Sequence, residues 1–122
     1  LSGRYLQAPF LVANPKFHLH TVITSGSTTP KEIYDWVRVS HAFDAVLADP
    51  DIDLVSITTP NETHFDYARR ALLAGKHVLV EKPMTATAAE AEALIALAKQ
   101  QNRVLSVYQN RRFDGDFQTV QK

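Results

Sequence analysis

The sequence predicts an α/β protein with a doubly wound, mostly parallel sheet, and three observations support this fold class. Short β-branched runs alternate with helical runs of about ten residues. Residues that start and stop helices separate these runs. Polar and charged side chains gather where the β-branched runs end. Such an alternation implies right-handed βαβ crossovers and helices on both faces of the sheet.

The first half of the chain opens with a predicted helix that Asn14-Pro15 ends. The next run alternates apolar and polar residues, which predicts a strand. Thr29, Pro30 and Glu32 then form a helix start, with Thr as the cap and Pro at the first helical position. The predicted elements are helix Leu1–Ala13, strand Phe17–Thr24, turn Ser25–Ser27, a helix from Thr29, strand Val37–Ser40 and helix Ala42–Ala48.

The second half of the chain carries sharper signals. Gly75 is the predicted C′ residue of one helix. Thr87 and Glu90 form a capping box at the start of another, which we expect to bury one apolar face. That predicted face consists of Ala91, Leu94, Ile95 and Ala98. The predicted elements are strand Asp53–Thr58, helix His64–Ala74, strand His77–Val80, a helix from Thr87, strand Val104–Tyr108 and a helix begun in Phe113–Lys122.

Size and composition are those of an ordinary globular domain. The 122 residues suit one domain, 45% of them are apolar and 21% are charged. Because 13 basic and 13 acidic residues cancel, no net field favours nucleic acid or an acidic membrane surface. No apolar run approaches a membrane span, and we expect no signal peptide. Cysteine is absent, so there is neither a disulfide framework nor a thiolate metal site, and we expect a cytoplasmic protein.

Four strand-to-helix junctions are the candidate binding region. Ligands of open α/β sheets bind outside the carboxyl ends of the strands, where the strand order reverses. The junctions are Thr24–Ser27, Thr58–His64, Glu81–Met84 and Gln109–Phe113. The spacing therefore predicts a pocket at the strand ends, without saying what fills it.

Three of these junctions carry motifs in register. They are Thr58-Thr59-Pro60-Asn61 with His64, the run Ala74–Pro83 with its Glu81-Lys82-Pro83, and Gln109–Asp114. Together they closely resemble the glucose–fructose oxidoreductase/inositol dehydrogenase (Gfo/Idh/MocA) family over nearly the whole chain. The resemblance implies an N-terminal Rossmann domain that binds NAD or NADP, followed by a mainly β domain carrying substrate and assembly surfaces. It further implies oxidation or reduction of a hydroxyl of a sugar, inositol or related polyol, in a homo-oligomer. The Asn-Arg-Arg run favours the branch of NADP-linked scyllo-inositol-type dehydrogenases.

The chain departs from the family pattern at both ends. The family begins with an apolar strand and a Gly-x-Gly-x-x-Gly turn, so Gly3 would be the third of these glycines. The first strand belongs in the centre of the sheet, and without it two neighbouring strands would lack a partner. We therefore expect the natural protein to be longer at both ends. Residues 1–112 are the predicted NAD(P)-binding domain lacking its first strand, and 113–122 the start of a linker into a C-terminal substrate domain.

The resemblance assigns cofactor roles to individual residues. Gly3 would open a helix toward the pyrophosphate, although a lone glycine is more often an ordinary loop residue. The turn after the second strand offers Thr24 and Ser25 but no carboxylate for a ribose diol, which favours NADP over NAD, with Lys31 as counter-charge. The alternative is a plain serine-rich turn. The predicted cofactor-binding residues are Gly3, Thr24, Ser25, Thr58, Thr59, Pro60, Asn61, His64, Glu81, Lys82, Gln109, Asn110 and Arg112.

Lys82 is the predicted catalytic residue. In the family this lysine lies between nicotinamide and substrate, where a cation stabilises the alkoxide that develops as hydride leaves carbon. If it is buried it also relays a proton, and Glu81 holds the nicotinamide ribose or orients Lys82. The alternative interpretation of this motif is a solvated Glu-Lys pair before a proline turn. For Asn61 the plainer role is a helix cap, shared with Thr63, and for His64 it is a surface position.

These residues predict hydride transfer, with a further acid or base supplied by the second domain, so that the fragment alone is inactive. Two alternatives remain open. One is a regulator of the same fold that binds the dinucleotide as a signal without catalysis, and the other is a reductase of another small-molecule class. No metal site is predicted, because His18 and His20 merely share a predicted strand face and no histidine has ligand spacing with carboxylates.

Overall fold

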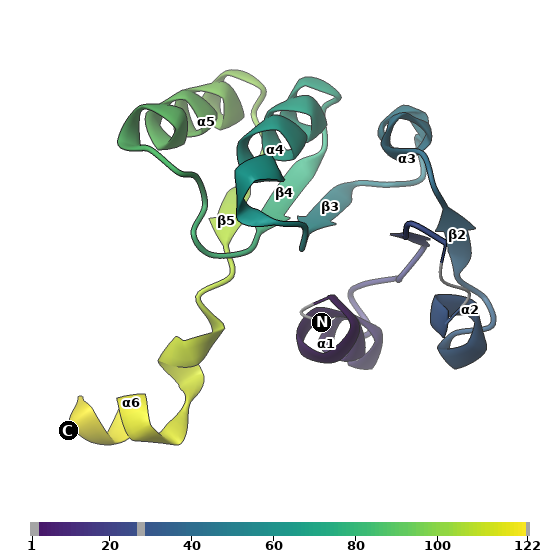
Figure 1. Cartoon of the computed structure of the whole chain (residues 1–122), viewed down its shortest axis with the longest axis horizontal. Coiled ribbons are helices and arrows are strands. Elements are labelled where there is room, and N and C mark those ends of the chain that lie inside the picture. Colours follow the sequence, from purple (N-terminus) through teal and green to yellow (C-terminus); the bar gives the residue numbers. More distant parts are fainter. Residues whose placement is uncertain (1–2, 27–28, 122) are drawn as a thin grey trace.

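The computed structural model describes residues 3–26 and 29–121, and it alternates strands and helices as the sequence predicts (Figure 1). Leu1, Ser27 of the predicted turn and Lys122 lie outside the described residues. Within the described ranges, no helix is long and apolar enough to span a membrane. The elements are η1 (Gly3–Gln7), α1 (Ala8–Ala13), β1 (Thr21–Ile23), α2 (Thr29–Ile33), β2 (Arg38–Ser40), α3 (Phe43–Ala48), β3 (Leu54–Ile57), η2 (Asn61–Thr63), α4 (His64–Leu73), β4 (His77–Val80), α5 (Ala88–Gln100), β5 (Leu105–Val107), η3 (Asn110–Phe113) and α6 (Gly115–Val120).

The strands form two parallel sheets. β1 pairs with β2, with Val22 opposite Val39. In the other sheet β4 lies between β3 and β5. Val80 is opposite Ile57 on one side and Val107 on the other. The parallel order confirms the predicted α/β class, because parallel neighbours need the helical crossovers that the sequence contains.

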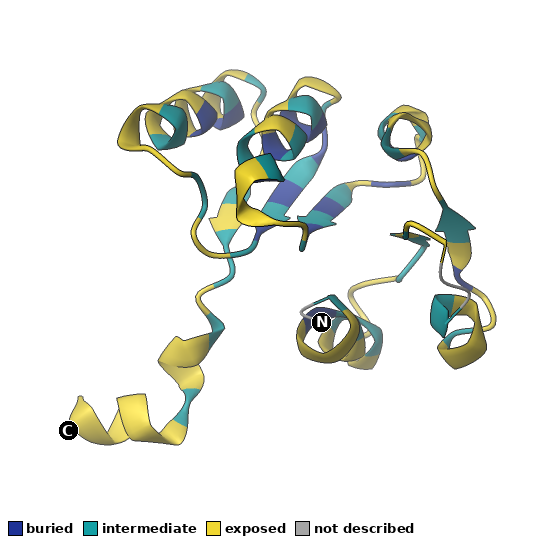
Figure 2. Ribbon diagram, in the orientation of Figure 1, coloured by how far each residue is buried: buried dark blue, intermediate teal, exposed yellow. Residues whose placement is uncertain are grey.

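The main core lies between the three-stranded sheet and helices α4 and α5, which pack side by side on one of its faces (Figure 2). Alternate residues of β3 and β4 point into this core, as strand geometry requires. The fully buried residues at its centre are Ile57, Ala68, Ala71, Leu72, Val78, Val80 and Leu94. Burial of these side chains is the main stabilising term of this half of the molecule.

The N-terminal helix, η1 continued by α1, lies on the opposite face of the same sheet. Val55 and Ile57 of β3 are buried toward α4, so Ser56 between them faces the other way. The hydroxyl of Ser56 donates a hydrogen bond to Gln7 Oε1 at the end of η1. Helices therefore cover both faces of the sheet, as a doubly wound fold requires.

β1 and β3 are not paired with each other, and a cavity of about 500 Å³ is lined by both strands. Gln7 and Leu11 of the N-terminal helix also line it. Two neighbouring strands were expected to lack a partner, and within the described residues β1 and β3 each have an edge without a strand partner.

Several elements differ from their predicted extents. The strand expected over Phe17–Thr24 is confined to Thr21–Ile23, because only this segment pairs with β2. His18 and His20 thus precede the strand, with ring centroids 6.2 Å apart. The helix expected in Phe113–Lys122 is divided into η3 and α6, which projects away from the sheets (Figure 1).

Helix α5 begins at the predicted capping box, where the Thr87 hydroxyl accepts a hydrogen bond from Glu90 N at 3.3 Å. Its buried residues are Leu94 and Ala98. Ile95 was expected on the same face but is 45% exposed, because the contact with α4 and β5 follows a narrower stripe than the apolar pattern. Gly75 ends α4 with a φ of 73°, as predicted for a C′ residue.

Candidate dinucleotide-binding site

The start of η1 is packed tightly against the end of β3. A Cβ atom added at Gly3 would lie 2.9 Å from Thr58 Oγ1, closer than real Cβ contacts allow. Gly3 is therefore needed because the helix backbone approaches the strand end, which is the role that the third glycine of a dinucleotide-binding turn has. Gly3, Thr58 and Thr59 line the same cavity.

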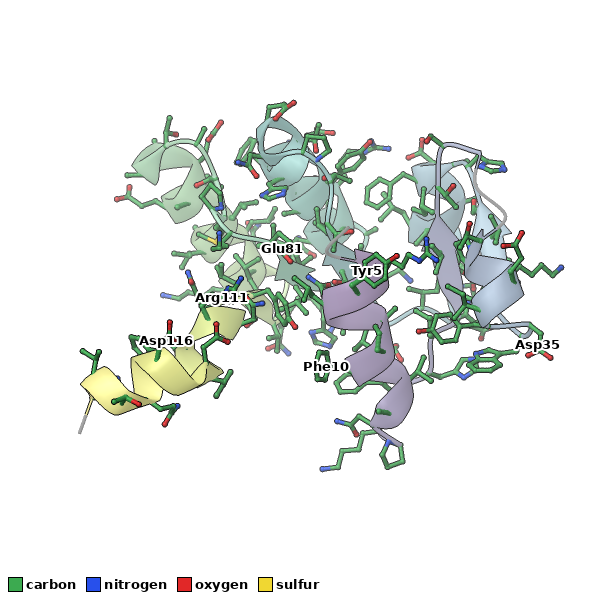
Figure 3. All side chains as sticks on the ribbon, turned by 60° about the horizontal axis from the view of Figure 1, so that its bottom comes forward. Tyr5, Phe10, Asp35, Glu81, Arg111 and Asp116 are labelled. Atoms are coloured by element: carbon green, nitrogen blue, oxygen red, sulfur yellow. The ribbon has the colours of Figure 1, made fainter. Side chains whose placement is uncertain are left out.

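Gln7, one turn further along the helix, links β3 to the end of β4. Its Nε2 donates a hydrogen bond to Glu81 Oε1 at 3.0 Å, and its Oε1 accepts one from Ser56. Gln7 is only 3% exposed. Figure 3 shows Glu81 beside the N-terminal helix that carries Tyr5 and Phe10.

Tyr108 extends the same pattern to β5. Its backbone N donates to Val80 O at 2.8 Å, so Tyr108 continues the β4–β5 pairing beyond the strand. Its hydroxyl donates to Leu6 O in η1. Partial burial raises the pKa of Tyr108, and the neighbouring Glu81 carboxylate raises it further. The phenol therefore stays protonated at neutral pH and can keep donating this bond.

The Thr58–His64 junction is held by its own hydrogen bonds. The Thr63 hydroxyl lies 2.7 Å from both Thr59 Oγ1 and Pro60 O. Thr63 occupies the N-cap position of α4, but its side chain makes no capping bond, and Asn61 begins the preceding η2. The expected cap by Asn61 or Thr63 is thus wrong, because the short η2 turn directs the chain into α4 instead. Thr59, Pro60 and Asn61 are exposed at the rim of the sheet.

His64 is fully buried beneath this junction, at 0% exposure. Its Nδ1 lies 2.8 Å from Pro83 O and its Nε2 lies 3.0 Å from Thr59 O. The ring therefore joins the Thr58–His64 junction to the Glu81–Met84 junction. A surface position for His64 is excluded, and both of its nitrogens are engaged within the protein.

The Glu81–Pro83 turn follows β4 directly. Glu81 N donates to Ile57 O at 3.0 Å, which fixes the turn to the end of β3, and Glu81 Oε2 accepts from Lys82 N at 3.3 Å. Lys82 itself is exposed. The proton relay was expected only for a buried lysine, and that condition is not met in this chain. The exposed Lys82 does present a cation at the strand ends.

The remaining junctions lie on either side of this centre. Thr24 is fixed by its neighbours: its N donates to Ser40 O at 3.1 Å, its carbonyl lies 2.6 Å from His41 Nδ1, and its hydroxyl accepts from Gly26 N at 3.1 Å. Ser25 is exposed and brings no carboxylate. Ile23, the residue before Thr24, lines the same cavity as Gly3.

The Gln109–Phe113 junction forms a separate hollow. Gln109 and Arg112 line a surface pocket of about 630 Å³ with residues of α6. Arg111 donates to Asp114 at 2.7 Å, and this bond raises the pKa of the guanidinium. Asn110 begins η3 and is half-buried. This junction is joined to the central site through Tyr108 rather than through a shared cavity.

Sequence reasoning missed Gln7, Ser56 and Tyr108. A signal was present for Gln7, since Gly3, Gln7 and Leu11 follow a spacing of four and share one helix face. Ser56 stood out as the hydroxyl within an apolar strand. No local pattern pairs Tyr108 with Leu6, because the two are 102 residues apart.

The geometry fits a dinucleotide at this edge of the sheet. A Cβ atom at Gly3 would collide with the Thr58 hydroxyl unless that side chain moved, and the N-terminus of the helix opens beside Thr58. Such an N-terminus suits an anion, and the polar strand ends supply donors and acceptors along the edge. Parallel strands with helices on both faces and this close approach define an NAD(P)-binding Rossmann domain.

The chain belongs to the Gfo/Idh/MocA group, the oxidoreductase family with an NAD-binding Rossmann fold, whose model matches residues 2–109. It is 39% identical to scyllo-inositol 2-dehydrogenase (NADP(+)) IolW of Bacillus subtilis over 100% of this chain and 34% of that protein. An oxidoreductase structure from Bacillus cereus matches with a TM-score of 0.91 and 34% identity, over 99% of this chain and 37% of that chain.

A more distant structure is that of biliverdin reductase with biliverdin and NADP+ from Synechocystis, with a TM-score of 0.85 and 30% identity. The match covers 93% of this chain and 37% of that chain. The chain spans about a third of the length of the curated relatives it matches, 34% in two of them.

Proposed function

We propose that the protein, in its natural length, is an NAD(P)-dependent dehydrogenase that moves a hydride between the nicotinamide and a hydroxyl-bearing carbon of a sugar, inositol or related polyol. Family membership supports the oxidoreductase class. The polyol substrate class is supported by the similarity to scyllo-inositol 2-dehydrogenase over the whole chain. The same relative supports NADP, because its name specifies that cofactor.

The observation that carries the proposal is the convergence of three strand ends on one helix start. η1 contacts Thr58 after β3 through Gly3, Glu81 after β4 through Gln7, and Tyr108 after β5 through Leu6. A bound dinucleotide lies along such an edge in Rossmann folds, with its phosphates at the helix N-terminus. Residues Thr58–Asn61 then line the nucleotide, and Glu81 holds the nicotinamide ribose.

Lys82 carries the chemistry in this proposal. Its exposed ammonium projects from the end of β4 and can donate a hydrogen bond to the reacting hydroxyl oxygen. As the hydride leaves the carbinol carbon, negative charge grows on that oxygen, and the adjacent cation lowers the barrier by stabilising it. The nicotinamide, when bound, supplies the hydride acceptor or donor. A second acid or base comes from outside residues 1–112, in the domain that residues 113–122 begin to connect.

The proposed preference for NADP rests on the turn after β1. Thr24 and Ser25 present hydroxyls, and no carboxylate stands there to repel a 2′-phosphate. Lys31, exposed on α2, is the proposed counter-charge. Replacing Ser25 with Asp should therefore shift the preference toward NAD, as measured by the ratio of the two dissociation constants.

The outer junction has a supporting role. Gln109 and Asn110 offer amides to the carboxamide or to substrate hydroxyls, and Arg112 binds phosphate or secures the connection to the second domain. That second domain is also where we place the contacts of a homo-oligomer. We propose these roles from the position of the junction beyond Tyr108.

The test is turnover by the natural-length protein with NADP and a panel of inositols and aldoses. Lys82→Ala should lower kcat by about a hundredfold or more, since a charge stabiliser at the developing oxyanion is lost. Lys99→Ala, an exposed lysine at the end of α5, is the matched control and should leave kcat unchanged. An unchanged rate in Lys82→Ala would remove Lys82 from the mechanism.

The same substrate panel distinguishes the proposed function from the two alternative functions. Tight dinucleotide binding without turnover of any substrate would favour a regulator of the same fold. Reduction of a bile pigment in place of polyols would favour another small-molecule class, since the biliverdin reductase structure is 30% identical.

A further inference from the structure

Two buried polar side chains contact the turn that carries Lys82, from opposite faces of the sheet. Among the described residues, the buried polar side chains are Gln7, His64 and Lys76. Gln7 comes from the N-terminal helix on one face and His64 from α4 on the other. Each reaches a group of the Glu81–Pro83 turn that is distant in sequence.

The side chain of His64 holds the end of the turn through the backbone carbonyl of Pro83. Both of its ring nitrogens point at carbonyl oxygens, Pro83 O from Nδ1 and Thr59 O from Nε2. A neutral imidazole has one N–H and donates to one of these carbonyls, whereas an imidazolium donates to both. In either form, the buried ring at 0% exposure bridges the two junctions from within the packed interior.

Gln7 holds the start of the turn through the side chain of Glu81. Its amide is oriented by the Ser56 hydroxyl, which leaves the amide nitrogen directed at Glu81 Oε1, 3.0 Å away. The second carboxylate oxygen of Glu81 then accepts the backbone N–H of Lys82 at 3.3 Å. A chain of hydrogen bonds thus runs from β3 through η1 to the backbone of Lys82.

We propose that Gln7 and His64 are positioning residues that hold the Glu81–Pro83 turn between them and thereby set where Lys82 presents its ammonium. This inference rests on the proposed function only for its effect on catalysis. Lys82 is exposed and lies outside the packed core, so its own surroundings do not fix it. The precision that a charge stabiliser needs comes instead from the backbone on either side of it.

The competing explanation is that both residues merely satisfy buried polar groups and contribute to stability alone. In that case their loss would lower the unfolding midpoint and leave kcat of the folded protein unchanged. A positioning role predicts a fall in kcat at saturating cofactor and substrate, because a displaced Lys82 weakens an interaction made in the transition state.

The first experiment compares Gln7→Leu with Gln100→Leu in the natural-length protein; Gln100 is exposed at the end of α5. We expect Gln7→Leu to lower kcat about tenfold or more, and Gln100→Leu to leave it unchanged. Ser56→Ala removes the group that orients the Gln7 amide and should lower kcat in the same direction by less. Equal kcat in Gln7→Leu and Gln100→Leu would overturn the role of Gln7.

The second experiment uses the two amide replacements of His64. The amide nitrogen of Asn stands at the bonded position of Nδ1, and that of Gln reaches the position of Nε2. If the bond to Pro83 O positions the turn, His64→Asn should keep kcat within about threefold, and His64→Gln should lower it about tenfold. Equal effects of the two replacements would overturn the role of His64.

A stability control comes from the other end of β4. His77 Nδ1 accepts a hydrogen bond from Val104 N at 2.9 Å, far along the strand from the turn. His77→Leu should lower the thermal midpoint without lowering kcat. A loss of kcat as large as that of His64→Gln would show that general destabilisation explains both, against the positioning role.

Hydrogen exchange tests the inference independently of turnover. In Gln7→Leu and His64→Gln, exchange at the Lys82 amide should rise about tenfold or more, while the Val78 amide keeps its rate. If Lys82→Ala leaves turnover unchanged, the catalytic proposal fails and the exchange data still report whether the turn is held. If Lys82→Ala is inactive but Lys82 exchange does not respond to either variant, the positioning role fails alone.

Discussion

Strands β1 and β3 are both short parallel strands, yet they differ in what covers them. In β3, Val55 and Ile57 are buried against α4 at 7% and 3% exposure. In β1, all three residues are half-buried or exposed, and Ile23 is 42% exposed. The helices that follow differ in the same way, because α4 buries four residues and α2 none.

This difference separates the two ends of the candidate site. The turn that carries Lys82 stands on the half with the closed core, and buried polar side chains hold it. The Thr24–Gly26 junction follows β1, in which no residue is buried. In our proposal the nicotinamide therefore lies on the better-packed half, whereas the turn proposed to favour NADP lies on the less well-packed half. Variants in the two halves and at their junction test this difference in packing.

The largest effect is expected from truncating the core of the well-packed half. Leu72 in α4 is 0% exposed, so Leu72→Ala should lower the free energy of unfolding by about 2–5 kcal/mol. Ile33 in α2 is 46% exposed, and Ile33→Ala should lower it by about 1 kcal/mol or less. Urea unfolding of the natural-length protein measures both. Equal losses would abolish the contrast between the two halves.

The next effect is expected where the N-terminal helix meets β3. Gly3→Ala forces a Cβ to within 2.9 Å of Thr58 Oγ1, which should cost about 1–3 kcal/mol and weaken dinucleotide binding about tenfold. Gly115→Ala is the matched control, because nothing lies within 4 Å of its added Cβ. Fluorescence titration with NADP and NAD measures the affinity.

Thr58→Ala offers a rescue of that steric conflict. In the double variant Gly3→Ala with Thr58→Ala, the hydroxyl is gone and the unfolding midpoint should recover part of its loss. If the midpoint of Gly3→Ala equals that of the natural protein, the close approach between η1 and β3 is not a constraint.

The smallest effect concerns Asp49, which connects β2 to the other half. Its carboxylate accepts from Arg38 at 2.8 Å, and its carbonyl accepts from Lys76 Nζ at 2.6 Å. The backbone N–H of Asp51 holds the pKa of Asp49 below its usual 3.8, with Arg38 adding to the effect. Because the folded-state pKa is the lower one, this contribution is present above about pH 4 and is lost as pH falls further.

Asp49→Asn should therefore lower the thermal midpoint slightly at pH 7 and make no difference once the pH lies well below 3.8. The measurement is the midpoint of both proteins between pH 7 and pH 2. A difference that persists at the acid end would assign the effect to packing of Asp49 rather than to its charge.

Most of the second half of the chain was predictable from local signals. The capping box at Thr87 and Glu90, the C′ residue Gly75 and the strand His77–Val80 all stand where the sequence predicts them. These signals depend on neighbours within a few residues, so no tertiary knowledge is needed to recognise them. The first strand was overestimated because its extent depends on a partner, β2, that local alternation does not reveal.

The candidate site was predictable as a set of junctions and motifs, but its internal connections were not. His64 was placed by its motif, yet its burial between Thr59 O and Pro83 O depends on how two turns meet. Gln7 has the periodicity of an inward-facing residue, but its partner Glu81 is 74 residues away. Burial of Lys82 was a condition of its proposed proton relay, and the structure leaves that side chain exposed.

The α/β class, the parallel strand order and the motifs at the strand ends follow from local patterns, because helix signals, strand alternation and turn residues are local properties of the chain. In contrast, the folded arrangement is needed to know which strand ends share one helix, which half has a closed core, and which polar groups hold the Lys82 turn. Those outcomes depend on contacts between residues far apart in sequence. Hydrogen bonds of that kind produce no regular residue spacing from which they could be predicted.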